Sequence, residues 1–276
     1  MQQPYIELRE RRELGTILSD SFTFIRLNRT PLWNVLLRTS GVFFLLSVLL
    51  SGLYQYVYIE SWMTSDPLYF FGVLFLMLFG SIFFIASLAA GIYAFMQNYI
   101  ETKGYVQEEV IIQNARLKVG QLVLLSVICY FIFILGGLFF IIPGIYFLVP
   151  LAIVFPVFYF KGIGKRASIK AAFKLTSGYW WVTFGTILVI VIVIGIISFV
   201  FQIPSTLYLG TKTFYSATGG NGELSGDFIY LFLATIASAA SNLLSIVMVI
   251  AFGLVYFDLD EEKNRTGVMA KLDDLG

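Results

Sequence analysis

Few side chains in this sequence have the types and spacing that chemistry requires. Histidine is absent, which removes the commonest general base and the commonest zinc ligand. The single cysteine, Cys129, lies in an apolar run and is expected to be a small buried hydrophobe. A carboxylate cluster near the end of the chain could bind a cation, but we favour a solvated tail that pairs with Arg9, Arg11 or Arg12. Its members are Asp258, Asp260, Glu261 and Glu262. We therefore predict a protein that is not an enzyme, with no catalytic residue, cofactor or metal.

The composition is that of a membrane protein. Of the 276 residues, 58% are hydrophobic and 13% are charged, whereas soluble domains carry roughly 25% charged residues. A net charge of +1, with basic residues spread over several loops, argues against a nucleic-acid partner. The polar N-terminus has no apolar core of a signal peptide, so the spans themselves are expected to direct the chain to the membrane. The sequence predicts an all-α polytopic membrane protein.

Hydrophobic runs and turn residues divide the chain into six spans, which we expect to pair as three hairpins. A cytoplasmic amphipathic helix is expected before each hairpin, which makes a threefold architectural repeat. Lysine and arginine gather in alternate connections, so both termini are predicted to be cytoplasmic. The predicted spans are about 32–56, 68–99, 121–142, 145–160, 179–201 and 228–257.

The segments outside the spans also have predicted roles. Residues 1–30 are expected to form an N-terminal cytoplasmic or interfacial helix, ahead of a six-span membrane domain over 31–257. Two further interfacial helices are predicted at about 105–118 and 164–177. Residues 202–227, rich in Gly, Ser and Thr, are expected to be the longest non-helical loop. Residues 258–276 are expected to be a cytoplasmic tail.

Prolines mark the fourth span as unusual. Pro143 and Gly144 are expected to form the tight turn that begins it, and Pro150 and Pro156 lie within it. Because each proline removes a backbone donor, the freed carbonyls must be met by neighbouring helices. We interpret the span as a kinked structural helix, and a hinge or broken helix that lines a cavity is the alternative.

A basic helix follows the fourth span. Five cations arrive within 14 residues without an acid among them, and three of them form an i, i+4 row on a helix. This pattern predicts contact with lipid headgroups, and Trp180 and Trp181 are expected at the level where the next span enters the membrane. The cations are Lys161, Lys165, Arg166, Lys170 and Lys174.

Two polar residues and one small-residue face lie inside predicted spans. Arg38 is expected to extend back to the interface, with a functional intramembrane arginine as the alternative. Asn242 is interpreted as the donor or acceptor of a helix–helix hydrogen bond, or alternatively as a polar lining of a pathway. The spacing of Ala86 and Ala90, and of Ser87 and Gly91, indicates a face for close helix packing.

Four stretches together resemble a known family. They are RELGTILSDSFTFIRLNRTPLW, IIPGIYFLVPLAIVFPVFYF, KLTSGYWWVTFG and VYFDLDEEKNRTGV. They are similar to bacterial six-span proteins that include the membrane domain of glycerophosphodiester phosphodiesterases and related stand-alone proteins, especially those of Bacteroidetes-type bacteria. The phosphodiesterase barrel with its metal-binding carboxylates and histidines is absent, so the resemblance carries over no catalytic residue. It implies an accessory membrane module.

Two functions are consistent with these patterns. The first is a structural or assembly subunit of a membrane protein complex, with membrane lipids and other membrane proteins as partners. The second is a transporter or lipid-handling protein with a cavity between the hairpins, near Pro150, Pro156 and Asn242. A lipid-sized cavity would favour the second function, and an apolar outer face suited to another protein would favour the first.

Overall fold

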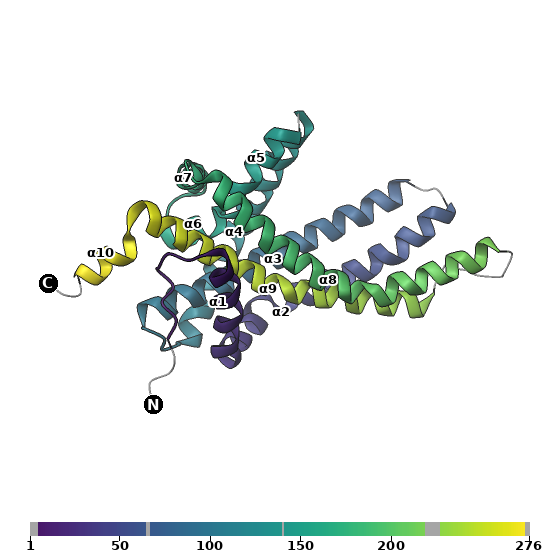
Figure 1. The fold of residues 1–276 in the computed structure, drawn as a ribbon. Helices are drawn as coiled ribbons and strands as arrows, with labels where there is room; N and C mark the ends of the chain where they lie inside the picture. The colour runs from purple at the N-terminus through teal and green to yellow at the C-terminus, as the bar shows by residue number, and fades with distance from the viewer. Residues whose placement is uncertain (1–4, 65–66, 140, 219–226, 274–276) are drawn as a thin grey trace. The chain divides into compact units, whose positions relative to one another are not determined.

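The computed structural model describes residues 5–64, 67–139, 141–218 and 227–273. Within these ranges the chain is helical and contains no strand (Figure 1). The helices are α1 (Leu14–Leu27), α2 (Arg29–Thr64), α3 (Pro67–Glu101), α4 (Glu108–Phe139), α5 (Ile141–Ala152), α6 (Val154–Lys161), α7 (Lys165–Thr176), α8 (Trp180–Ala217), α9 (Phe228–Asn264) and α10 (Thr266–Asp273).

Six stretches are long and apolar enough to cross a membrane, which confirms the predicted all-α class and the six apolar spans. They are Arg29–Tyr58, Pro67–Glu101, Glu108–Gly137, Pro143–Lys161, Trp180–Ala217 and Phe228–Asn264. The pairing of the spans into three hairpins and the threefold repeat stay predictions.

Three predicted boundaries are wrong. Residues 202–217 are not a loop, because α8 continues to Ala217; residues 219–226 of that predicted loop lie outside the described residues. The predicted interfacial helix over 105–118 is not separate, since α4 runs unbroken from Glu108 into the third span. The first helix starts only at Leu14, and residues 5–13 are not helical. In the first case α8 continues through Pro204, which lies inside the helix. In the second case no proline lies between Glu108 and Phe139 to interrupt α4, whose backbone bonds are already formed.

The chain folds as two compact units, each built from separate stretches of sequence. Unit 1 comprises Met1–Ser40, Ala86–Val191 and Ile246–Gly276. Unit 2 comprises Gly41–Ile85 and Ile192–Ser245. Because α2, α3, α8 and α9 pass from one unit into the other, neither unit is a continuous domain of the predicted kind.

Small side chains let two helices of unit 1 approach closely. Ala86, Ala90 and Ser87 of α3 are fully buried, as the small-residue face predicts. A Cβ added at Gly91 would lie 2.8 Å from Oγ1 of Thr39 on α2, so only glycine fits there without a shift. The core continues into a cluster of aromatic rings, in which Phe24 of α1 meets Tyr99 edge to face at 5.2 Å between centroids.

The fourth span is broken rather than merely kinked. Helix α5 ends at Ala152 and α6 begins at Val154, with Ile153 between them at φ −102° and ψ 3°. Pro156 lies in the first turn of α6, where a missing N–H costs nothing, but Pro150 lies inside α5. Since Pro150 has no N–H, the carbonyl of Tyr146 four residues earlier loses its partner. The indole N–H of Trp180 on α8 donates to that carbonyl at 3.1 Å. A neighbouring helix thus supplies a partner for the freed carbonyl, as predicted.

The tight turn that begins this span is placed differently from the prediction. Pro143 and Gly144 lie inside the first turns of α5, and α4 has already ended at Phe139. Proline is tolerated in a first turn because the first N–H groups of a helix have no intrahelical partner. Gly144 instead allows close packing, since a Cβ there would lie 3.2 Å from Cα of Gly137 on α4.

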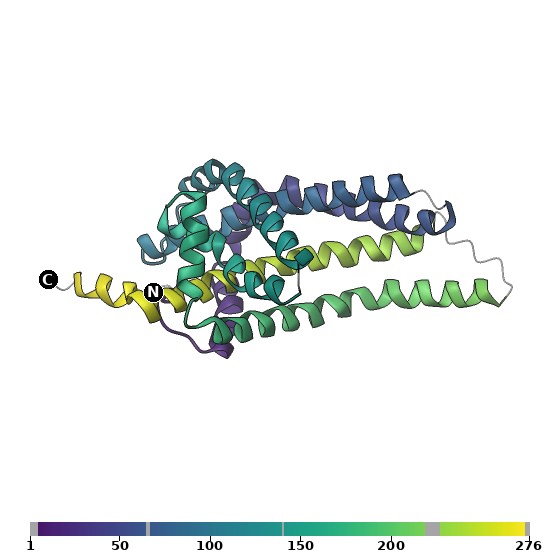
Figure 2. The same ribbon diagram turned by 90° about the horizontal axis from the view of Figure 1, so that it is seen from above.

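Contacts within unit 2 join its helices in the order α3, α2, α9, α8. Leu50 of α2 fills the space beside Gly80 of α3, and the two helices run alongside each other in both ribbon views (Figure 2). Tyr230 of α9 donates to Gln55 of α2 at 3.0 Å. The ring of Tyr230 also packs with Tyr208 of α8 in a small core cluster.

Replacing Trp180 by Phe should expose the Tyr146 carbonyl while keeping an aromatic ring beside Tyr146, whose ring stacks on Trp180 at 5.7 Å. We expect a loss of about 1 kcal/mol of unfolding free energy, because a lone acceptor loses its only partner. Thermal unfolding of the purified protein in detergent measures this loss, and Trp181→Phe is the matched control.

A double variant makes this prediction specific. In Pro150→Ala, the new N–H can bond to the Tyr146 carbonyl itself, so Trp180→Phe should cost less in that background. Equal costs in both backgrounds would show that the indole does not replace the missing N–H.

Candidate functional site

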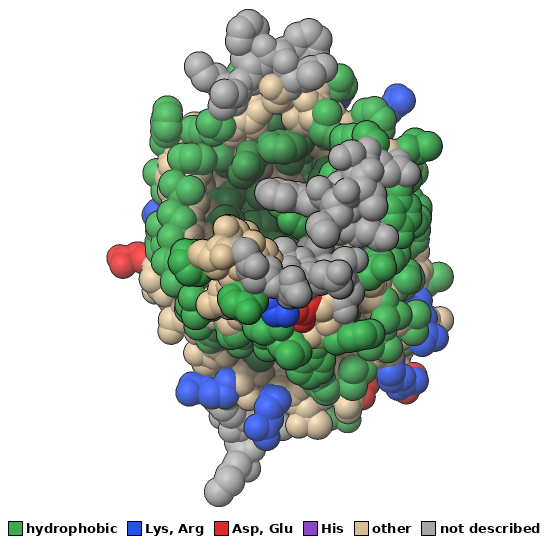
Figure 3. All heavy atoms as spheres, turned by 90° about the vertical axis from the view of Figure 1, so that its right-hand side faces the viewer, with side chains coloured by type: hydrophobic (Ala, Val, Ile, Leu, Met, Phe, Trp, Pro, Cys, Tyr) green, Lys and Arg blue, Asp and Glu red, His purple; other side chains and the backbone are tan. Residues whose placement is uncertain are grey.

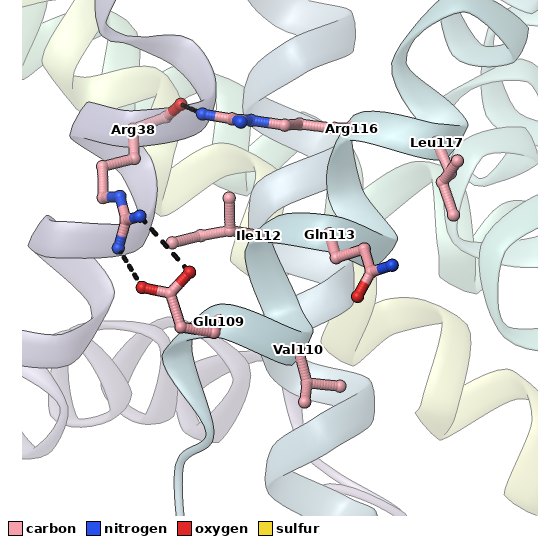
Figure 4. Close-up of a pocket in the computed structure, with 7 residues that line it drawn as sticks. All are labelled: Arg38, Glu109, Val110, Ile112, Gln113, Arg116 and Leu117. Atoms are coloured by element: carbon pink, nitrogen blue, oxygen red, sulfur yellow. Dashed lines mark hydrogen bonds and ion pairs between the residues drawn. The ribbon is translucent and has the colours of Figure 1, made fainter.

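A groove in unit 1, beside α2 and α4, combines charged and apolar side chains (Figure 4). Its volume is about 450 Å³. Arg38 of α2 reaches towards Glu109 of α4, with two bonds of 2.6 and 3.3 Å between guanidinium and carboxylate. Arg116, two turns further along α4, donates to the backbone carbonyl of Arg38 at 3.2 Å. The groove therefore holds two guanidinium groups on one side of a carboxylate.

Further polar groups surround this groove. Gln113 of α4 lines it, and Asn34 of α2 donates to both carboxylate oxygens of Glu108 at 3.3 and 3.4 Å. The predicted alternatives for Arg38 are thus partly resolved: it forms an ion pair, and both partners are open to the surroundings, with side chains 48% and 77% exposed for Arg38 and Glu109. An exposed pair of this kind stabilises little because water screens it, so it can open for a ligand at little cost.

An apolar strip leads away from the groove along α4. Leu117 lines the groove, and Leu124 and Phe131 follow it at seven-residue spacing, so the three lie on one helix face. All three side chains are exposed. Charged side chains and an apolar strip therefore meet at this groove.

A second polar cluster, also in unit 1, joins the two ends of the chain. The side chain of Arg12 is fully buried and pairs with Asp20 at 2.9 Å. Its guanidinium also donates to the backbone carbonyls of Glu7, Leu8 and Glu10. The backbone N–H of Arg12 donates to Asp258 at 2.8 Å. One guanidinium thus satisfies the non-helical backbone that precedes α1.

The carboxylates at the end of α9 are not a solvated tail. Asp260 and Glu261 are buried, and Glu261 accepts from the N–H groups of Gly267 and Val268 at the start of α10. Asp260 accepts from Lys161, Asn264 and Thr266. The predicted pairing with the N-terminal arginines is confirmed for Arg11, which lies 2.6 Å from Glu262. Among the described residues, no group of three carboxylates or thiols is placed to hold a metal.

The basic helix is α7 and carries its charges outward. Lys161 pairs with Asp260 at 3.3 Å. The other four cations make no ion pair with a described residue, and three of them are exposed; they are Lys165, Arg166, Lys170 and Lys174. Trp180 is half-buried against Tyr146, whereas Trp181 is exposed. Such a face suits anionic headgroups, and that role stays a prediction.

The hinge and cavity candidates are not gathered at one site. Pro143, Gly144, Pro150 and Pro156 belong to unit 1, whereas Asn242 belongs to unit 2. The Asn242 amide donates to Ser47 of α2 at 3.1 Å, which supports its interpretation as a helix–helix contact. In membranes such bonds contribute about 0.6 kcal/mol each.

The sequence-based prediction of a loop over residues 202–227 does not include one polar cluster of unit 2. Asp227 caps α9 by accepting from the N–H groups of Ile229 and Tyr230 at 3.1 and 3.2 Å. The same carboxylate pairs with Lys212 at 3.0 Å and accepts from the Tyr208 hydroxyl at 2.9 Å, both on α8. An Asp directly before an apolar run is an N-cap signal, and it was available in the sequence.

Comparisons with protein-family models, curated proteins and solved structures found no match to this chain. The resemblance to the membrane domain of glycerophosphodiester phosphodiesterases therefore stays a hypothesis. What the structure establishes is the class: a helical protein with six helices long and apolar enough to cross a membrane.

Replacing Arg12 by Met should destabilise unit 1 by about 3–5 kcal/mol, because Asp20 and several carbonyls lose a buried charged partner. The measurement is thermal unfolding in detergent, together with protease sensitivity of residues 5–13. Arg11→Met is the control: its side chain is 69% exposed, and its pair should be worth less than about 1 kcal/mol. Similar losses for both variants would contradict the assigned role of Arg12.

The Asp227 cap should make stability depend on pH. Burial opposes the charge, but hydrogen bonds from the Tyr230 N–H, Lys212 and Tyr208 hold the pKa of that carboxyl below its ordinary value of 3.8. Because the folded pKa is the lower one, the stabilisation is complete well above pH 3.8 and is lost as the pH falls through the folded value.

Asp227→Asn should therefore lower the unfolding temperature at pH 6, and the gap to the unmodified protein should shrink at pH 3. Unfolding curves in detergent at both pH values measure the gap. A gap of constant size would show that the charge of Asp227 does not contribute.

Proposed function

We propose that this chain is a non-catalytic integral protein of a bacterial cytoplasmic membrane and acts as a structural or assembly subunit of a membrane protein complex. The distribution of lysine and arginine supports a cytoplasmic position for both termini. The observation that carries the proposal is the open face of α8. Only 17% of the residues in the most apolar stretch of α8 are buried, compared with 56% in α9.

A glycine lies in the middle of this open face. Gly195 is exposed, and a Cβ added there would meet nothing within 4 Å. Ile192, Ile196 and Phe199 lie at −3, +1 and +4 from it and are also exposed. A glycine flanked by large apolar side chains forms a notch in which the backbone of a second helix can approach closely. Lipid chains need no such notch, so the feature favours a protein partner.

The length of α8 supports the same proposal. Its 38 residues extend over about 57 Å, whereas a hydrocarbon core is about 30 Å thick. To fit within that core the helix would need a tilt of about 58°, well beyond the observed range of up to about 40°. Part of α8 therefore lies outside the core with apolar side chains such as Leu207 and Phe214 exposed, and a partner protein would cover them.

Gly195→Leu tests this proposal. We expect tagged protein purified in mild detergent from its native membrane to carry stoichiometric membrane proteins, and the variant to lose them while its unfolding temperature stays unchanged. Mass spectrometry and size-exclusion chromatography measure the composition. Gly120→Leu is the matched control, since Gly120 of α4 is also exposed with open space around it. Loss of partners in both variants, or in neither, would contradict the α8 interface.

The second candidate function, lipid handling, is favoured by a different observation. Figure 3 shows a face on which hydrophobic side chains gather. The ends of the unit 2 helices carry exposed aromatic rings that include Phe71, Phe75, Phe228 and Phe232. Purification of a lone chain with a tightly bound lipid would support this function over the first.

A further inference from the structure

We propose that the groove between Arg38 and Arg116 binds a phospholipid whose headgroup carries both a phosphate and a primary amine, as in phosphatidylethanolamine. The site is independent of the α8 face, so it can fail or stand without the proposed complex. Its recognition would use the two guanidinium groups for the phosphate and the carboxylates of Glu109 and Glu108 for the ammonium group.

The guanidinium side of the groove fits a phosphate. Arg38 and Arg116 come from neighbouring helices, and Figure 4 shows the Arg116 guanidinium extended along the backbone of Arg38. Arginine binds phosphate oxygens through two parallel N–H donors, more specifically than lysine does. The hydrogen bond that Arg116 makes to the described part of the chain goes to a neutral carbonyl at 3.2 Å, so its other N–H groups can bind an anion.

The carboxylate side makes the groove unlike a general anion site. Glu109 lies opposite Arg38, and Glu108 precedes it beside Asn34. With two cations and one carboxylate in its lining, and Glu108 next to that carboxylate in the sequence, the groove attracts a zwitterion more than a simple anion such as a phosphate ion or an acidic lipid. Because the Arg38–Glu109 pair is exposed, a zwitterionic headgroup can exchange one ion pair for two at little cost.

The apolar strip provides for the rest of the lipid. Leu117 is the last groove residue along α4, and Leu124 and Phe131 continue the same face of the helix. Trp33 of α2 is exposed about one turn before Arg38, which suits the level of the headgroups. A lipid with its phosphate in the groove would therefore lay its acyl chains along exposed leucine and phenylalanine side chains.

Native mass spectrometry of the full chain in detergent tests this assignment with three lipids of identical acyl chains: phosphatidylethanolamine, phosphatidylglycerol and phosphatidylcholine. We expect the ethanolamine lipid to bind at least several-fold more tightly than the other two, because phosphatidylglycerol lacks the amine and phosphatidylcholine lacks N–H donors. Tighter binding of phosphatidylglycerol would overturn the role of the carboxylates.

Arg38→Gln combined with Arg116→Gln should weaken binding of the ethanolamine lipid by about tenfold or more. Arg26→Gln combined with Arg29→Gln is the control: both residues are exposed, neither lines the groove, and the two substitutions remove the same charge. Unchanged binding in the groove variant, or equal weakening in both, would overturn the site. The unfolding temperature of each variant without lipid shows that it is folded.

Glu108→Gln combined with Glu109→Gln separates the two halves of the headgroup. We expect this variant to bind phosphatidylglycerol as tightly as phosphatidylethanolamine, because only the phosphate is then recognised. A preserved preference for ethanolamine would overturn the proposed amine contact. Inorganic phosphate at millimolar concentration should not displace the lipid, and displacement would assign the groove to free phosphate instead.

Discussion

Polar groups that are removed from water must find partners inside the protein, and this constraint governs the whole structure. Each buried side-chain nitrogen or oxygen among the described residues has a hydrogen-bond partner. The fourth span shows how far the constraint reaches. Pro150 breaks the bonding of α5, and the chain returns 30 residues later with Trp180, whose indole restores the missing bond. The position of α8 beside α5 is thus coupled to a proline inside α5.

The same constraint explains why the two ends of the chain meet. Residues 5–13 are not helical, so their carbonyls need donors, and the buried guanidinium of Arg12 supplies several. At the other end Glu261 satisfies the first N–H groups of α10. Arg11 and the backbone of Arg12 then join these two irregular regions through Glu262 and Asp258. Charges that look like a solvated tail in the sequence are therefore structural.

The sequence predicted the parts that depend on local pattern. Hydrophobic runs gave the helical class and six apolar spans, and small residues gave the close contact at Gly91. The sequence-based prediction failed where residues far apart in the chain determine which side chains are buried. Nothing near Asp260 or Glu261 in the sequence shows that they become buried, because their partners include Lys161 and the backbone of α10. Residues 202–217 have the composition of a loop, but they are helical, and Tyr208 and Lys212 bond to Asp227.

The charged groove lies where two helices of unit 1, α2 and α4, meet through exposed polar contacts. α2 and α3 are joined by close packing at Gly91, whereas the polar contacts of Arg38 and Asn34 on α2 with α4 are exposed. Exposed ion pairs stabilise little. A ligand that binds to both α2 and α4 would therefore add more stability to their contact than to the tightly packed contact of α2 with α3. A headgroup held by Arg38 and Arg116 would join α2 to α4 at the point where their polar contacts are exposed. A bound lipid would then be a structural component of unit 1. It would supply missing contacts between two helices, as Trp180 of α8 supplies a missing hydrogen bond to α5.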